Sequence, residues 1–440
     1  MIHPLIKVVR SQAEGEHLGI YSVCSANRFV IEATVLQAKK DGMHALIEAT
    51  SNQVDQFGGY TGMTPAQFVT YVYGIAQSLD YPRGSILLGG DHLGPNRWRN
   101  ESAEEAMSKA RELVQAYVSA GFTKIHLDTS MRLGDDPGDA DIPPTPEVVA
   151  ERASDLALVA EEAYEVHPGN SSPPYYIIGT DVPHPGGAQE ATGRVHVTSK
   201  LVAQQTIQLH QEAFRKRDLQ SAWDRVIGIV VQPGVEFGDG IVEEYKPEKA
   251  VQLSRLIEEY DNLVYEAHST DYQTGETLRK MVADHYAILK VGPWLTFAFR
   301  EALFALAYME SEWLSAHKSV ALSNLRAVLE DAMISEPVYW QDHYHGDEHQ
   351  QQYARKYSYS DRVRYYWPVT EVQAAVARLI ANLEHSPPPL TLVSQHMPNQ
   401  YRAIREGRIK NTPQDMIHDK IMEVTELYAR ACGNSLKSLQ

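Results

Sequence analysis

The sequence is poor in cysteine, in long apolar runs and in net positive charge. Its 440 residues include only two cysteines, Cys24 and Cys432. Neither a disulfide framework nor a cysteine-rich zinc site can be built from two cysteines, which fits a reducing compartment. The longest apolar stretch, 286–309, is interrupted by three charged residues, so we do not expect it to span a membrane.

The formal net charge of -17 argues against binding to nucleic acid or to an anionic membrane surface. An anionic substrate would therefore need a local cluster of Arg, Lys or backbone N–H groups. The first residues, 1–4, lack the basic and apolar regions of a signal peptide, and we expect a cytoplasmic protein. No glycine-rich dinucleotide fingerprint follows the first predicted strand.

Short apolar runs alternate with amphipathic helical segments over the first 290 residues. The runs typical of strands are 18–24, 44–49, 85–90, 124–128, 175–180, 226–231, 263–268 and 286–291. Eight such units predict an α/β fold, a (β/α)8 TIM barrel over residues 1–292. A doubly wound open sheet is the alternative, because the pattern alone does not reveal closure.

From Thr296 onward the pattern is helical and rich in aromatic residues, without further strand runs. No flexible linker precedes this part of the chain. We therefore interpret 293–440 as an α-helical extension packed on the barrel.

The predicted strands end in polar residues, and in a barrel these ends form the active site. Asp91 and His92 follow the third strand directly, and His268 follows the seventh. A capping Asp and a core His is the alternative reading of the first pair. The candidate metal ligands, which would suit Zn²⁺ or Mn²⁺, are His92 and His268 with Glu236, Gln232 or Asp181 as oxygen ligands. His126 lies inside its strand and is interpreted as a residue behind the site or as core.

Other polar segments are candidates for binding substrate or phosphate. They are Asn52 and Gln53 with the glycine-rich loop 53–63, Ser269 and Thr270 after the seventh strand, Lys290 in the eighth, and Arg362 and Arg364 in the aromatic segment 357–367. The glycine-rich loop either covers the mouth or is a plain surface loop. For the two arginines a purely structural ion-pair role is the alternative.

Several long motifs resemble the GatZ/KbaZ family. They are the segments 48–63, 89–97, 230–238, 265–273, 289–293 and 357–367. The resemblance implies a class II aldolase-like barrel, in which Asp91 and His92 correspond to the acid and the metal ligand, and His268 to a second metal histidine. Two positions depart from the family pattern, Thr129 where Cys is usual and Asp181 where Glu is usual.

The resemblance implies two functions in carbohydrate (galactitol or tagatose) catabolism. One is a 4-epimerase acting on tagatose 6-phosphate and fructose 6-phosphate, and the other is a non-catalytic subunit that stabilises a class II tagatose-1,6-bisphosphate aldolase. A homo-oligomer is compatible with either function.

For the epimerase, deprotonation at C3 cannot invert C4, so we expect cleavage and re-formation of the C3–C4 bond. Asp91 would be the general base, and Glu48 or Asp271 would carry a proton on the far side.

Overall fold

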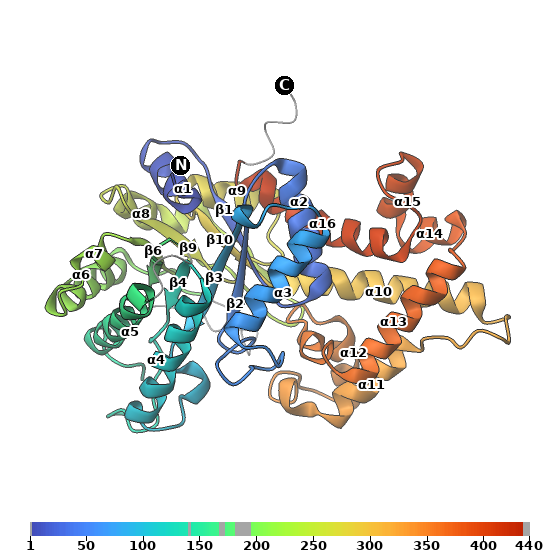
Figure 1. The fold of residues 1–440 in the computed structure, drawn as a ribbon, viewed down its shortest axis with the longest axis horizontal. Helices are drawn as coiled ribbons and strands as arrows, with labels where there is room; N and C mark the ends of the chain where they lie inside the picture. The colour runs from blue at the N-terminus through green and yellow to red at the C-terminus, as the bar shows by residue number, and fades with distance from the viewer. Residues whose placement is uncertain (1, 140–141, 167–171, 181–194, 434–440) are drawn as a thin grey trace.

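The computed structural model of the chain describes residues 2–139, 142–166, 172–180 and 195–433. Eight parallel strands close into a barrel in the order β1-β10-β9-β6-β5-β4-β3-β2 (Figure 1). The barrel strands are β1 Ile20–Cys24, β2 Ala45–Thr50, β3 Ile86–Leu93, β4 Lys124–Leu127, β5 Tyr175–Ile178, β6 Val226–Val230, β9 Val264–Ala267 and β10 Ile288–Val291. The predicted TIM barrel is thus confirmed, and the open sheet is excluded because β1 pairs with β10.

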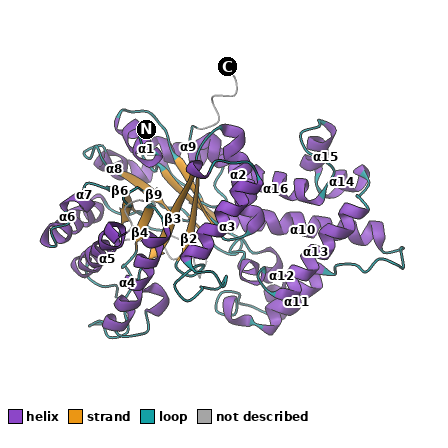
Figure 2. Cartoon of the chain, viewed as in Figure 1, coloured by secondary structure: helices purple, strands orange, loops and turns teal. Residues whose placement is uncertain are grey.

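Helices surround the barrel and form the C-terminal part of the chain (Figure 2). The helices that precede or alternate with the strands are α1 Pro4–Ala13, α2 Arg28–Asp41, α3 Pro65–Ser78, α4 Ala103–Ala120, α5 Pro146–Val166, α6 Lys200–Lys216, α7 Gln220–Trp223, α8 Pro247–Ile257 and α9 Gly275–Ala283. Those after the barrel are α10 Pro293–Leu314, α11 Leu325–Ser335, α12 Glu348–Tyr357, α13 Thr370–His385, α14 Leu390–His396, α15 Pro398–Arg405 and α16 Pro413–Ala431, with the 3-10 segment η4 Arg362–Tyr366 before α13. None of the helices in the described ranges is both long and apolar enough to cross a bilayer.

The helix boundaries follow from capping residues in the sequence. The Ser102 hydroxyl accepts a hydrogen bond from the backbone N–H of Glu105 and so caps the start of α4. Gly121 ends the same helix in a left-handed conformation with φ of 100°, which glycine adopts without steric strain. These local signals set the two ends of α4.

The last helix belongs to the ring of helices around the barrel. α16 packs against α2, α9 and α10, which is the position of a helix between the eighth strand and the first. Gly19 at the start of β1 donates its backbone N–H to the Cys432 carbonyl at 3.1 Å, which fixes the end of α16 to the barrel. The arm that projects from the barrel therefore covers residues 293–412, and the predicted division at 292 cuts through the helix ring (Figure 1).

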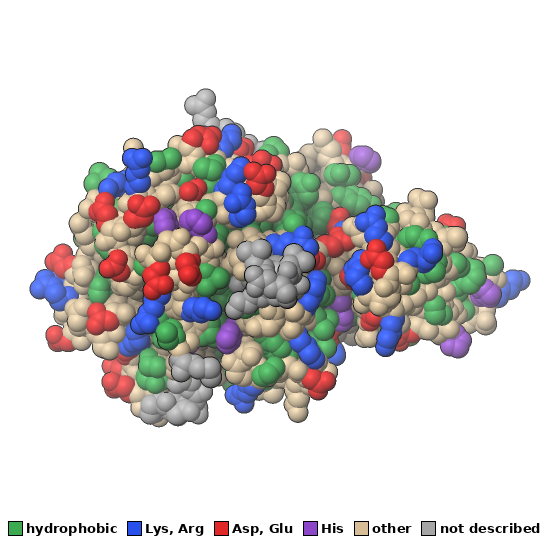
Figure 3. All heavy atoms as spheres, turned by 90° about the horizontal axis from the view of Figure 1, so that it is seen from above, with side chains coloured by type: hydrophobic (Ala, Val, Ile, Leu, Met, Phe, Trp, Pro, Cys, Tyr) green, Lys and Arg blue, Asp and Glu red, His purple; other side chains and the backbone are tan. Residues whose placement is uncertain are grey.

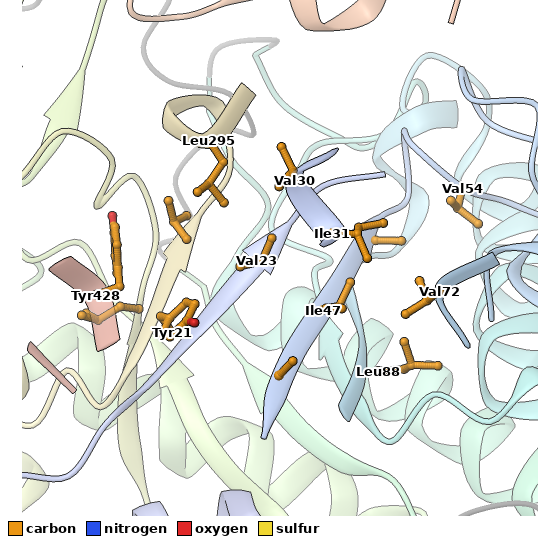
Figure 4. Close-up of a cluster of buried hydrophobic side chains, with 14 of the residues drawn as sticks. Tyr21, Val23, Val30, Ile31, Ile47, Val54, Val72, Leu88, Leu295 and Tyr428 are labelled. Carbon is orange, nitrogen blue, oxygen red and sulfur yellow. The ribbon is translucent and has the colours of Figure 1, made fainter. Parts of the chain in front are cut away.

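Apolar side chains fill the space between the strands and the helices. Figure 4 shows Val23 and Ile47 of β1 and β2 directed toward Val30 and Ile31 of α2. A second apolar cluster fills the barrel at the end where the strands begin, and it includes Leu5, Val8 and Val9 of α1 together with Ile20, Leu46, Leu87, Val264 and Ile288. Helix α1, which the sequence pattern did not predict, thus closes the lower end of the barrel.

Two strand features differ from the prediction. β3 extends three residues beyond the predicted end at Gly90 and so contains Asp91 and His92. A two-stranded antiparallel hairpin, β7 Glu236–Phe237 and β8 Val242–Glu243, follows β6.

On the face drawn in Figure 3, acidic and basic side chains are interspersed rather than gathered into one basic patch.

Candidate metal centre and active site

Asp91 and His92 both reach the barrel interior although they are neighbours in one strand. Successive side chains of a regular strand point to opposite faces. Here His92 has a φ of 50°, and the pairing of β3 with β4 shifts register between Gly90 and Leu93. The bulge turns His92 inward beside Asp91, so that the Asp91 Oδ2 and His92 Nε2 atoms are 3.9 Å apart.

Three imidazoles form a nearly equilateral triangle at the top of the barrel. The ring centroids of His92 and His126 are 5.0 Å apart, those of His92 and His268 4.8 Å, and those of His126 and His268 5.1 Å. Together with Asp91, the three residues offer ligand atoms that all lie within 4.8 Å of one another. Ligands of a tetrahedral zinc ion are about 3.4 Å apart, so a small contraction would bring this group around one ion.

Each imidazole has a carboxylate on one ring nitrogen. The Nδ1 atom of His92 lies 2.7 Å from Oδ2 of Asp128. The Nδ1 atom of His126 lies 3.0 Å from Oδ1 of Asp91, and the Nε2 atom of His268 lies 3.0 Å from Oε1 of Glu266. Such carboxylate–imidazole pairs orient metal-binding histidines. The His126 Nδ1 atom also accepts the backbone N–H of His92 at 3.2 Å, which further fixes the position of this ring.

Three observations indicate that these residues fit a divalent cation. The His126 Nε2 atom is buried and has no hydrogen-bond partner. Burial lowers the pKa of His268 to about 4, so its ring is neutral near pH 7 and can offer a lone pair. Burial also acts to lower the pKa of His92, but Asp91 and Asp128 outweigh it and raise this pKa, which shows that positive charge is favoured at this point.

Four buried charges lie directly below the histidines. Lys124 contacts Glu48 and Glu266, each at 2.7 Å, and Lys290 contacts Glu48 and lies 3.0 Å from Asp91. We call Glu48, Lys124, Glu266 and Lys290 the ionic layer. With Asp91 and Asp128 included, four carboxylates face two ammonium groups, and the excess equals the charge that one divalent cation would neutralise.

Gly89 makes room for the ionic layer. It stands in register between Glu48 on β2 and Lys124 on β4. A Cβ atom at Gly89 would lie 2.7 Å from Cγ of Glu48, which crosses over the glycine to reach Lys124. Gly89 is therefore required because the Glu48 side chain passes so close that it leaves no room for a Cβ atom.

A pocket of about 660 Å³ opens above the histidines. Asp91, His92, His268 and Lys290 form its floor, and its wall includes residues of α2, α10, η4 and α13. Burial would raise the pKa of Asp91, but Lys290 and His92 hold it well below its usual range, so this floor carries an ionised carboxylate.

Asp271 is a second acidic group on the pocket wall. Its Oδ1 atom accepts hydrogen bonds from the backbone N–H groups of Gly292 and Trp294, at 3.0 and 2.8 Å, at the start of α10. Burial raises the pKa of Asp271 to about 6. The pocket therefore contains two carboxyl groups with widely different proton affinities, which is typical of acid–base pairs.

The family model described as D-tagatose-1,6-bisphosphate aldolase subunit GatZ/KbaZ-like matches residues 5–433. The chain belongs to this family. A solved structure titled as a probable tagatose 6 phosphate kinase from Sinorhizobium meliloti 1021 is 43% identical, with a TM-score of 0.85 over 94% of this chain and 100% of that one. A fructuronate-tagaturonate epimerase from Cohnella laeviribosi is 12% identical, with a TM-score of 0.49 over 96% of this chain and 84% of that one.

Most of the residues singled out in the sequence of this GatZ/KbaZ-like chain do lie together. The pocket is lined by Asp91, His92, His268, Asn52, Gln53, Ser269, Asp271, Lys290 and Arg364. The glycine-rich loop also contributes Tyr60, Thr61 and Met63, so it covers part of the mouth. Lys290 was expected to bind substrate or phosphate, but its ammonium group is held among carboxylates.

Three candidates are engaged beside or below the pocket instead of lining it. Glu48 is fully buried between two lysines, so it has no open path to a substrate. Thr270 donates its hydroxyl to the Lys290 carbonyl, and Arg362 donates to the Tyr339 carbonyl. Their partners, which come from distant parts of the chain, could not be inferred from local sequence.

Two of the three expected oxygen ligands of the metal, Gln232 and Glu236, are used in other contacts. The Gln232 Oε1 atom accepts from the backbone N–H groups of Gly234 and Val235, so it is used in its own turn. Glu236 lies in β7, its Oε1 atom accepts from the N–H of Phe237, and it is outside the cluster of ligand atoms. Asp181 lies outside the described residues.

Asp128, Glu266 and Lys124 were not predicted to take part in the site, and His126 was not predicted to be a ligand. Every second side chain along a strand points to the same face, and this alternation could have revealed these residues. Positions 124, 126 and 128 all face inward, as do positions 264, 266 and 268. His126 was judged a core residue or a residue behind the site, and it instead completes the triangle.

Proposed function

We propose that this chain is a metal-dependent 4-epimerase of ketohexose 6-phosphates, which interconverts tagatose 6-phosphate and fructose 6-phosphate by cleaving and re-forming the C3–C4 bond. The observation that carries the proposal is a carboxylate on the pocket floor, Asp91, that lies within 4.8 Å of ligand nitrogens of three carboxylate-paired imidazoles. Membership in an aldolase-subunit family supports the same bond chemistry.

His92, His126 and His268 would hold the cation, and their imidazole donors suit Zn²⁺ or Mn²⁺, while the nearby Asp91 carboxylate stays available as a base. A bound divalent cation would act as a Lewis acid on the ketose oxygens and so take up charge that develops on them as the bond opens.

Asp91 takes the proton from the C4 hydroxyl as the C3–C4 bond breaks. The electron pair of that bond stays on the three-carbon fragment with the ketone, and C4 becomes the aldehyde carbon of the phosphorylated fragment. After the aldehyde turns its other face, the pair re-forms the bond, and the C4 oxygen takes a proton from Asp271, whose pKa of about 6 allows it to carry one. After product release, Asp91 gives its proton to water and Asp271 takes one from water, which restores both groups for the next turnover.

The phosphate would keep the aldehyde fragment in the pocket while it turns. Arg364 lines the pocket wall, and Ser269 and the amides of Asn52 and Gln53 are further donors there. Arg364 is the favoured phosphate ligand because it lines the pocket. Its guanidinium already donates to the Ser360 and Asp361 carbonyls and to the Tyr365 hydroxyl, so its remaining N–H groups would bind the phosphate.

An accessory role is the second candidate function, and the description of the family as an aldolase subunit favours it. In that case, the isolated chain would stabilise a catalytic class II aldolase and would not turn over substrate. The ionised carboxylate and the histidine triangle are features that a scaffold does not need.

The deciding experiment is incubation of the purified, zinc-loaded chain with fructose 6-phosphate carrying deuterium at C4. We expect tagatose 6-phosphate with the deuterium retained at C4, and no product after chelation or in Asp91→Asn. Loss of the label to water would exclude carbon–carbon cleavage, and absence of any turnover would favour the accessory role.

A further inference from the structure

Lys124 lies deeper in the barrel than any residue of the proposed reaction. It is fully buried on β4, does not line the pocket and cannot reach a substrate. We propose that Lys124 is a positioning residue: it fixes Glu266, and through Glu266 it holds the His268 imidazole ready for the metal. This inference rests on the metal centre of the proposed function.

The contacts form a continuous chain from Lys124 to the histidine. The Lys124 Nζ atom is 2.7 Å from Oε2 of Glu266, and the other oxygen of the same carboxylate, Oε1, is 3.0 Å from Nε2 of His268. All of Lys124 and Glu266 is inaccessible to solvent. An ion pair at one oxygen and a hydrogen bond at the other restrict the rotation of this carboxylate, and so restrict the ring that donates to it.

The other two orienting carboxylates have anchors of their own. Asp128 accepts from the Ser130 hydroxyl at 2.7 Å, and Asp91 lies 3.0 Å from the Lys290 ammonium. Lys290 is 3.9 Å from Glu266, too far for a short contact. Lys124 is therefore the anchor of the third carboxylate.

A lysine is not needed at this position to fill the barrel. Interior layers of such barrels are usually filled with branched apolar side chains, and burial of an ammonium group opposes folding unless it is paired. Methionine has nearly the length of lysine without its charge. Lys124→Met should therefore fold and should reveal what the charge does for the metal site.

The test compares Zn²⁺ affinity, measured by competition with a chromophoric chelator, in Lys124→Met, Glu266→Gln and the double variant. We expect each single change to weaken binding by about 10–100-fold, the range found when orienting partners of metal ligands are removed. The double variant should bind no more weakly than Glu266→Gln alone, because Lys124 acts through Glu266.

Arg355→Met is the matched control, since Arg355 is another buried cation, paired with Glu330 in the arm. It should lower thermal stability but leave Zn²⁺ affinity unchanged. If Lys124→Met fails to fold, Lys124→Gln, which keeps a donor toward Glu266, should show a smaller loss of affinity.

Unchanged Zn²⁺ affinity in the folded Lys124 variants would overturn the inference, as would losses that simply add in the double variant. A wild-type chain that binds no Zn²⁺ would instead overturn the metal centre itself. The two failures are thus distinguishable before any activity is measured.

Discussion

The lower and upper halves of the barrel interior are built by the same strands from opposite kinds of residue. At the lower end, Leu46, Val264 and Ile288 pack with α1 in an apolar cluster. Two residues further along, the same inward face carries Glu48, Glu266 and Lys290, and His268 follows directly after the end of β9. The lower half stabilises the fold, whereas the upper half holds charges that only a site can use.

This comparison explains why the molecule tolerates so many buried charges. Burying an ion in a protein interior costs several kcal/mol even after relaxation. The apolar lower half and the helix ring supply the stability that offsets this cost. Substitutions in the two halves should therefore separate stability from activity.

The largest effect is expected for Asp91→Asn in the upper half. An amide cannot take the proton of the C4 hydroxyl, so kcat should fall by about 10²–10⁴-fold, the contribution of a positioned acid or base. Steady-state assay of fructose 6-phosphate conversion measures this change. Activity within tenfold of wild type would remove Asp91 from the mechanism.

In the lower half, Leu46→Ala should lower the free energy of unfolding by about 2–5 kcal/mol, because it opens a cavity in the apolar cluster. Zn²⁺ affinity of the folded protein should stay as in wild type. Denaturant unfolding and a zinc titration check the two parts. A large loss of zinc affinity would contradict the separation of the halves.

At the boundary between the halves, Gly89→Ala should disturb both. The added methyl group meets the Glu48 side chain, so the ionic layer must shift, at a cost of about 1–3 kcal/mol and with weaker Zn²⁺ binding. Gly84→Ala is the control, because no atom lies within 4 Å of the position its Cβ would take. Equal behaviour of the two variants would refute the close-approach argument.

The smallest effect concerns Asp271, and its sign depends on pH. Because the folded-state pKa is raised to about 6 from 3.8, the proton-bound form is favoured on folding. This stabilising contribution is present below pH 3.8 and is lost as pH rises through about 6. Asp271→Asn, which cannot ionise, should therefore be more stable than wild type by about 1–3 kcal/mol at pH 7.5 and equal to it near pH 4.

Thermal unfolding at the two pH values tests the Asp271 prediction, and the same variant should lose epimerase activity. A lower melting temperature than wild type at pH 7.5 would mean that the ionised carboxylate stabilises the start of α10. Greater stability with less activity is the expected pattern for a strained functional group.

The barrel could be predicted because its signals are local. Apolar runs, capping residues such as Ser102 and stop signals such as Gly121 fix the order and limits of the elements. The place of α16 in the helix ring could not be predicted, because it depends on packing between segments far apart in the chain.

The residues of the site that the sequence indicated most directly are those at strand ends. Asp91, His92 and His268 stand at strand ends and line the pocket. Lys124 and Glu266 are charged residues within apolar runs, and only closure of the barrel brings them within 2.7 Å of each other. The choice between Arg362 and Arg364 likewise depends on tertiary contacts, since one donates to Tyr339 and the other lines the pocket.

The central claim is that the upper half of the barrel forms one metal centre with three imidazole ligands. X-ray absorption spectroscopy of the chain loaded with one equivalent of Zn²⁺ tests this claim most directly. The account predicts a single class of bound zinc with three imidazoles, and loss of one imidazole in His126→Ala. A zinc shell without imidazoles, or one unchanged in His126→Ala, would contradict it.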